Sequence, residues 1–225
     1  MSGALAIFVK TPGHSALKSR LAAGCGERYA VEWYRRAAAA VASVAREANA
    51  RHGVTGYWAV AEPDALGAWP GLSTLAQGEG GLGARMARVH AELVARHGFG
   101  LLLGADTPQL TATLLGDAAD WLSKPSPRLL VGPASDGGFW LFGGNVAPAP
   151  RAWDAVGYSA ADTARQLLHS MRDVGDWRTL ATLSDVDHAS DLAGVLDELE
   201  ALPDSTPEQR ELARWMREQE RVSWS

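Results

Sequence analysis

Residues 99–108 read FGLLLGADTP, a short apolar run that ends in glycine, an acid and proline. Phe99–Leu103 has the length of a buried strand. Thr107-Pro108 ends the strand, because proline has no N–H to donate to a sheet ladder. The segment therefore predicts a buried strand that delivers Asp106 to its carboxyl end.

Strand and helix patterns alternate along the rest of the chain. Strands are predicted at Ala4–Val9, Val54–Ala61, Phe99–Leu103, Leu129–Val131, Phe139–Phe142 and Thr179–Leu183. Helices are predicted at Glu27–Arg51, Leu82–Gly98, Thr111–Leu122, Asp162–Met171 and in two closing segments, the last at about 207–219. This alternation indicates an α/β fold with a mostly parallel sheet covered on both faces. With no repeat or low-complexity linker, we expect one domain over 1–225.

The composition limits the classes of partner. The chain has 225 residues, 47% of them hydrophobic, and a net charge of 21 − 26 = −5. It therefore has no overall attraction to nucleic acid or to anionic membranes. No apolar run approaches the length of a membrane span. The single cysteine, Cys25, rules out an internal disulfide, so we expect a cytoplasmic protein that binds small molecules.

Three cations follow the first predicted strand. Lys10, Lys18 and Arg20 lie within eleven residues of its end, in a loop that also contains Gly13. Such a loop can neutralise phosphate oxygens, although its glycine spacing fits neither a Walker A loop nor a GxGxxG fingerprint. A solvated turn with surface lysines explains the same pattern.

Two loop aspartates each have a functional and a structural interpretation. Asp106 is a hard oxygen ligand suited to Mg²⁺ or Mn²⁺, or a turn residue that accepts backbone N–H bonds. Asp136 precedes Gly137, which suits either a substrate pocket or a hairpin turn.

A third acidic segment lies late in the chain. Asp185 and Asp187 share one face of an extended stretch, because side chains alternate with a period of two. The pair can bind a cation, or Asp187 can cap the next helix with Asp191 in its first turn.

Taken in order, these segments resemble the DUF2064 family, also described as radical-SAM/selenodomain-associated transferase 1, within the GT-A nucleotide-diphospho-sugar transferase superfamily. The similar segments are Phe8–Gly13, Lys18–Leu21, Gly83–Met86, Gly104–Leu110, Gly132–Leu141 and Asp185–Asp187. The chain departs from the family at Ser19, where threonine is commoner, and at Tyr158-Ser159, where many members have Trp followed by Ser or Thr.

The resemblance implies a GT-A-like Rossmannoid three-layer α/β/α sandwich and a role for each segment. It implies nucleotide or phosphate binding by Lys10, Thr11, Pro12, Gly13, Lys18 and Arg20. It implies metal binding by Asp106 and Asp187, catalysis by Asp106 and Asp136, and substrate binding by Arg85, Gly137 and Gly138.

The implied activity is a metal-dependent transferase that uses Mg²⁺ or Mn²⁺, a nucleotide-diphospho-sugar and a small-molecule acceptor. Two alternatives stay open: a nucleotidyltransferase that uses an NTP and releases pyrophosphate, and a non-catalytic nucleotide-binding protein. The closing helix has Leu212, Trp215 and Met216 on one face. That face packs on the core or buries a homodimer interface.

Overall fold

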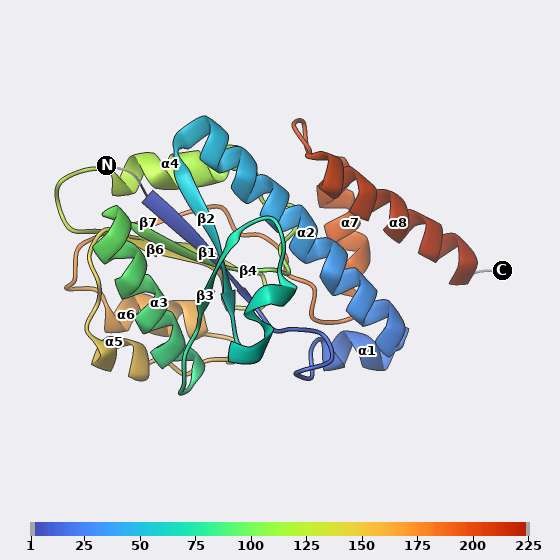
Figure 1. Cartoon of the computed structure of the whole chain (residues 1–225), viewed down its shortest axis with the longest axis horizontal. Helices are drawn as coiled ribbons and strands as arrows, with labels where there is room; N and C mark the ends of the chain where they lie inside the picture. Colours follow the sequence, from blue (N-terminus) through green and yellow to red (C-terminus); the bar gives the residue numbers. More distant parts are fainter. Residues whose placement is uncertain (1–2, 224–225) are drawn as a thin grey trace.

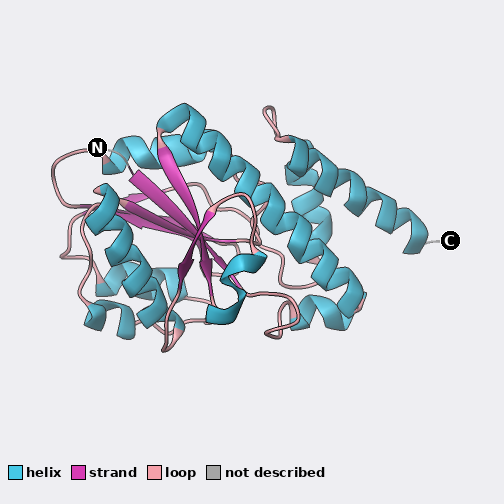
Figure 2. Ribbon diagram, viewed as in Figure 1, coloured by secondary structure: helices cyan, strands magenta, loops and turns pink. Residues whose placement is uncertain are grey.

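The computed structural model describes residues 3–223, and side chains only as far as residue 220. Within this part the strands form one seven-stranded sheet in the order β3-β2-β1-β4-β6-β5-β7 (Figure 2). The strands are β1 (Gly3–Val9), β2 (Val54–Val60), β3 (Ser73–Ala76), β4 (Gly100–Gly104), β5 (Arg128–Pro133), β6 (Phe139–Gly144) and β7 (Asp176–Thr179). Only β6 is antiparallel to its neighbours. The prediction of a mostly parallel sheet is therefore confirmed.

Helices cover both faces of the sheet, which confirms the predicted three-layer α/β/α arrangement. The helices are α1 (Ser19–Cys25), α2 (Glu27–His52), the 3₁₀ helix η1 (Pro63–Ala68), α3 (Leu82–His97), α4 (Ala112–Leu122), α5 (Pro150–Asp154), α6 (Thr163–Ser170), α7 (Asp191–Glu200) and α8 (Pro207–Ser223). One face is covered by α3, α5 and α6, and the other by α2 and α4. In Figure 1, α7 and α8 lie beyond α2, on the side away from α3.

The central strand β1 shows why the sheet needs helices on both faces. Leu5 and Ile7 belong to the hydrophobic core beneath α2 and α4. Ala4 and Ala6 belong to the second core, beneath α3. All four are fully buried, because successive side chains of a strand point to opposite faces and here both faces are covered.

The closing helix packs on the core and extends further than predicted. α8 begins at Pro207 as expected but continues to Ser223 instead of ending near 219. Leu212 and Met216 are buried in the core beneath α2. Trp215 stacks on Tyr29, with ring centroids 4.9 Å apart. The apolar face of α8 is therefore used for core packing.

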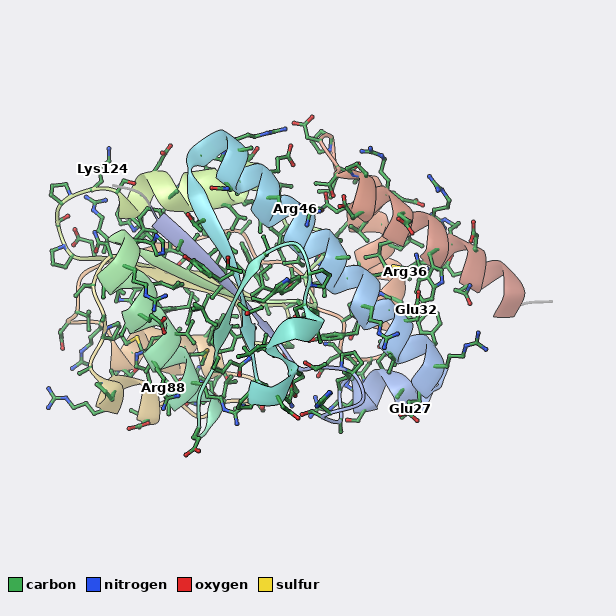
Figure 3. All side chains as sticks on the ribbon, viewed as in Figure 1. Glu27, Glu32, Arg36, Arg46, Arg88 and Lys124 are labelled. Atoms are coloured by element: carbon green, nitrogen blue, oxygen red, sulfur yellow. The ribbon has the colours of Figure 1, made fainter. Side chains whose placement is uncertain are left out.

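Ion pairs complete the contact between α2 and α8. Arg36 donates to Glu211 at 3.0 Å, and Arg46 donates to Glu208 at 2.5 Å. Figure 3 labels both arginines on α2, on the stretch that runs alongside α8. These pairs are largely exposed, so we expect them to orient α8 more than to stabilise it.

The bounds of the last strand were predicted wrongly. The structure has β7 at Asp176–Thr179, whereas the apolar pattern placed the strand at Thr179–Leu183. β7 pairs with β5 only as far as Thr179, opposite Val131, and Leu183 forms only an isolated bridge with Ala134. The short elements β3, η1, α1 and α5 were not predicted.

Candidate functional site

The loops that follow β1 and β4 meet at the carboxyl edge of the sheet, where ligands bind in folds of this kind. They enclose a cleft of about 600 Å³. Its lining includes the charged residues Lys10, Lys18, Arg85, Asp106 and Asp187. Five of the predicted site residues are therefore brought together from segments far apart in the sequence.

Lys18 is the centre of this charge arrangement. Its ammonium Nζ donates to Asp106 Oδ2 at 2.7 Å and to the carbonyl oxygen of Val186 at 2.6 Å. It also lies 3.6 Å from Asp187 Oδ1. The Lys18 side chain is only 8% exposed. The two predicted metal ligands thus already face a shared cation.

The charge of Lys18 is fixed by its surroundings. Burial disfavours the ammonium and lowers the pKa of Lys18. The negative charge and hydrogen bond of Asp106, together with the charges of Asp187 and Asp185, outweigh that effect and raise the pKa of Lys18 above its usual 10.5. The side chain is therefore a permanent cation inside the cleft.

The backbone of Lys18 is strained. Its φ of 48° and ψ of 39° lie in the left-handed region, immediately before α1. In the described part of the chain the only other non-glycine residue with positive φ is Ser159, which lines a second cavity next to the cleft. Such conformations cost of order 1–3 kcal/mol and persist where the surrounding contacts enforce them.

The loop after β1 is held by a carboxylate that the sequence analysis did not single out. Glu62 accepts the backbone N–H of Thr11 at 2.9 Å and the hydroxyl of Ser15 at 2.5 Å. Burial alone raises the pKa of Glu62, but the hydrogen bonds from Ser15 and Thr11 lower it below the usual 4.5. Tyr34 accepts the backbone N–H of Lys10 at 3.1 Å. These bonds fix the backbone path that leads to the cations.

Three residues of that loop lie apart from the cleft. Thr11 is buried, and its hydroxyl accepts the indole N–H of Trp69 at 2.9 Å. Thr11 and Pro12 line a different cavity, beside Trp58 and Trp69. Gly13 has a φ of 88° and open space around its α-carbon. These three residues were predicted to bind phosphate. In the structure they lie outside the cleft, where they stabilise and bend the loop.

The segment after β7 gives its two aspartates different partners. Arg20 donates to Asp187 Oδ2 at 2.8 Å, whereas Lys18 lies 3.6 Å from the other oxygen, Oδ1. Asp191, at the start of α7, accepts the backbone N–H groups of Asp187 and His188 at 2.9 and 2.7 Å. These two bonds order the backbone before α7, whose N-cap is Ser190 and has no side-chain cap hydrogen bond. Asp187 therefore does not cap the helix, and its carboxylate faces the cations.

Asp185 was noted as half of an acidic pair but was not assigned to the site. It lines the second cavity together with Asp136. Burial, followed by the negative charges of Asp106 and Asp136, raises the pKa of Asp185 to about 6. The signal that could have identified it is its place two residues before Asp187, on the same face of an extended segment.

The second cavity adjoins the cleft and is largely apolar. It has a volume of about 230 Å³ and shares Phe8, Leu82 and Gly104 with the cleft. Apolar residues dominate its walls, and the carboxylates of Asp136 and Asp185 lie at its edge. A molecule held here would lie beside a ligand in the charged cleft.

The predicted turn at Asp136 and the predicted pocket coincide. Asp136 Oδ1 accepts the backbone N–H of Gly138 at 2.7 Å, and both residues line the second cavity. Gly137 has a φ of 90°, and a Cβ there would lie 1.9 Å from the carbonyl oxygen of Ala161. Glycine is therefore required at 137 for the turn to pack against the following segment.

The carboxylates of the cleft suit a metal that shares its coordination with a substrate. Asp106 and Asp187 approach the same Lys18 nitrogen from two directions, so their positions allow one cation to contact both. Among the described residues no three His, Cys, Asp or Glu side chains form a ready metal cluster. Mg²⁺ is commonly held by one or two carboxylates plus substrate phosphates and water, and Asp106 and Asp187 fit that pattern.

The described helices also bear on the membrane prediction. In the stretch from residue 3 to residue 223, no helix is both long and apolar enough to cross a bilayer.

The mostly parallel sheet, covered by helices on both faces, defines an α/β fold with a charged cleft at its carboxyl edge. The chain belongs to the DUF2064 family, described as an uncharacterized protein conserved in bacteria, whose sequence profile matches residues 36–160. That match includes Arg85, Asp106 and Asp136. The loop after β1 and Asp187 lie outside it.

Solved structures share the fold. A protein from Desulfovibrio desulfuricans G20, named a "putative nucleotide-diphospho-sugar transferase", is 24% identical with a TM-score of 0.80, over 96% of this chain and 99% of that one. Rv0371c from Mycobacterium tuberculosis H37Rv is 15% identical with a TM-score of 0.52, over 88% and 99% of the two chains. Its homolog from Mycobacterium sp. strain JC1 is 13% identical with a TM-score of 0.52, over 88% and 98%. No curated protein matches the sequence significantly.

Proposed function

We propose that this protein is a metal-dependent transferase that takes a nucleotide-diphospho-sugar as donor. The observation that carries the proposal is the placement of cations and carboxylates in one cleft. Lys10, Lys18 and Arg85 line it together with Asp106 and Asp187. A diphosphate needs cations around its oxygens, and in an acidic protein these must be gathered locally.

Asp106 and Asp187 would hold Mg²⁺ or Mn²⁺. Such an ion supplies electrostatic stabilisation of the negative charge that develops on the diphosphate leaving group. Lys10, Lys18 and Arg85 share that role, because hydrogen bonds between cations and phosphate oxygens are strong in a partly buried site. The chain thus stabilises the leaving group from several directions.

The adjoining apolar cavity would hold the acceptor. In the proposed reaction an acceptor hydroxyl oxygen forms a bond to the anomeric carbon of the sugar. The bond from that carbon to the diphosphate oxygen breaks, and its electron pair leaves with the nucleoside diphosphate. The hydroxyl proton passes to the Asp136 carboxylate, which lines the cavity.

The likeness of the whole fold to the Desulfovibrio protein supports a transferase. A nucleotidyltransferase would use the same cleft, with an attack on the α-phosphorus of an NTP and the loss of pyrophosphate. A non-catalytic nucleotide-binding protein would need the cations but no acceptor cavity.

Thermal unfolding with a ligand panel tests the proposal. The panel contains UDP-, GDP-, ADP- and CMP-sugars and the four common NTPs, each with and without Mn²⁺ or Mg²⁺. A ligand that binds only the folded state raises the melting temperature. A metal-dependent rise with one nucleotide-sugar supports the proposed donor. A rise only with an NTP favours nucleotidyl transfer, and no rise with any ligand contradicts both.

Two variants locate the binding. We expect Asp106→Ala to abolish the metal-dependent part of nucleotide binding, whereas Asp120→Ala, at an exposed position of α4, leaves it unchanged. Lys18→Ala should weaken nucleoside diphosphates far more than nucleosides. Lys124→Ala is its control, because Lys124 is an exposed lysine, labelled in Figure 3 at the far side of the sheet from α1 and α8. Equal losses for both ligands on Lys18→Ala would show that Lys18 does not contact phosphate.

A further inference from the structure

The Lys18 ammonium lies where a metal bound to both carboxylates would have to lie. It contacts Asp106 Oδ2 at 2.7 Å and lies 3.6 Å from Asp187 Oδ1. A third oxygen, the carbonyl of Val186, accepts from the same nitrogen at 2.6 Å. The ammonium therefore already lies among the oxygens that would have to bind the metal.

The local backbone supports this interpretation. The left-handed conformation of Lys18 is unfavourable for a residue with a side chain. The side chain is nevertheless held almost completely out of solvent. The contacts of the ammonium with the carboxylates offset the backbone strain, so they hold the lysine side chain in this position.

We propose that the Lys18 ammonium is the resident cation of the Asp106–Asp187 pair and excludes a divalent metal until a diphosphate draws the ammonium away. Two cations in van der Waals reach of the same carboxylates repel each other strongly. A diphosphate supplies the alternative partner that lets the ammonium leave, so metal binding follows donor binding. The release of the ammonium by a diphosphate rests on the proposed function, whereas the exclusion of the metal by Lys18 does not.

Arg20 provides a matched comparison. It also carries one positive charge beside Asp187, at 2.8 Å, but its side chain is 63% exposed and contacts Oδ2, whereas Lys18 approaches Oδ1. If general charge alone controlled metal affinity, removal of either cation would have a similar effect. If the position of the charge controls metal affinity, only the removal of Lys18 should raise it, because only Lys18 lies between Asp106 and Asp187.

The test measures the binding of Mn²⁺ alone to the metal-stripped chain, from the loss of the free-ion signal in electron paramagnetic resonance. We expect Lys18→Met to bind Mn²⁺ about tenfold or more tightly than the wild type, because the ammonium no longer competes. Arg20→Met should stay within about threefold of the wild type, since an exposed charge is screened. Equal gains for Lys18→Met and Arg20→Met, or no gain for Lys18→Met, would overturn the proposal.

A double variant separates position from net charge and protects the test against poor folding. Lys18→Met with Asp185→Asn removes one positive and one negative charge, so the cluster keeps its net charge. It also relieves the repulsion that Lys18→Met alone would leave among the carboxylates. We expect this variant also to bind Mn²⁺ about tenfold more tightly than the wild type. Wild-type affinity in the double variant would show that the ammonium does not exclude metal.

A second titration, with the manganese–pyrophosphate complex, tests the donor-dependent step. Here we expect the wild type to bind at least as tightly as Lys18→Met, because the ammonium has moved from the carboxylates to the phosphates. If Lys18→Met binds Mn²⁺ alone more tightly but the order does not reverse with pyrophosphate, exclusion of the metal stands and the assignment of a diphosphate ligand fails.

Discussion

Gln109 Nε2 donates to Glu198 Oε2 at 2.8 Å and so joins the loop after β4 to helix α7. The same amide nitrogen donates to the carbonyl oxygen of Ser184, and the Ser184 hydroxyl donates to Glu198 Oε1 at 2.8 Å. Asp106 precedes Gln109 by three residues, and Asp185 directly follows Ser184. This partly buried network therefore ties together the two loops that carry these acidic residues.

Disruption of this network should destabilise the fold and loosen the cleft. We expect Gln109→Leu to lower the free energy of unfolding by about 1–3 kcal/mol, because it removes the donor to one oxygen of the partly buried Glu198 carboxylate and to the Ser184 carbonyl. Urea unfolding of Gln109→Leu, Glu198→Leu and the double variant measures the coupling. A coupling energy of about 1 kcal/mol or more is expected, and strictly additive losses would contradict a direct bond.

Glu62 should control the order of the loop after β1. Glu62→Gln replaces one of its two acceptor oxygens with a donor, so the bond to the Thr11 N–H or to the Ser15 hydroxyl is lost. We expect faster hydrogen exchange in residues 10–17 and weaker nucleotide binding, with little change in global stability. Asp120→Asn is the control, since Asp120 lies at an exposed position of α4, away from this loop. Equal exchange rates in the two variants would refute the role.

The elements that position the cleft could be predicted from the sequence, and their contacts could not. The apolar runs of β1 and β4 are long enough to identify, and the charged residues that follow them are evident in the sequence. Lys18, however, meets Asp106 across 88 positions of sequence and Val186 across 168. Its left-handed backbone is also invisible in the residue pattern. The sequence could therefore predict a lysine near phosphate but not one between two carboxylates.

The missed features have comparable causes. β3 and α5 have four and five residues, too few for a periodic pattern to appear. The end of β7 depends on where its pairing with β5 stops, which is a property of the pair rather than of either segment. Glu62 could have been suspected, because it follows β2 at the same sheet edge where Lys10 follows β1.

Asp185 should make the metal-free protein less stable as the pH rises. Its pKa is about 6 in the folded state against 3.8 in the unfolded chain, so the folded state holds the proton more tightly. Protonation of Asp185 therefore stabilises the folded state fully below pH 3.8, and this stabilisation is lost as the pH rises through about 6. In EDTA at about pH 8, we expect Asp185→Asn to raise the free energy of unfolding by about 1–2 kcal/mol, which is less than the full pKa difference implies because solvent screens this half-buried carboxylate.

The pH series also provides the control for Asp185. The difference between Asp185→Asn and the wild type should shrink as the pH falls below about 6. Asp173→Asn, at a side chain that is 89% exposed, should show no such trend. A stabilisation by Asp185→Asn that is independent of pH would show that repulsion among the ionised carboxylates is not its cause.

Substitution by alanine should destabilise the fold at Gly137 and stabilise it at Gly194. At Gly137, a φ of 90° and a Cβ position 1.9 Å from the Ala161 carbonyl oxygen mean that alanine strains the backbone and displaces the following segment. We expect Gly137→Ala to lower the free energy of unfolding by about 2 kcal/mol or more. Gly194 lies inside α7, and no atom is within 4 Å of its Cβ position, so Gly194→Ala should raise it by about 0.5–1 kcal/mol. Urea unfolding of the two variants measures both free energies. A destabilised Gly194→Ala would contradict the open helical position at 194, and an unchanged stability of Gly137→Ala would contradict the strained turn at 137.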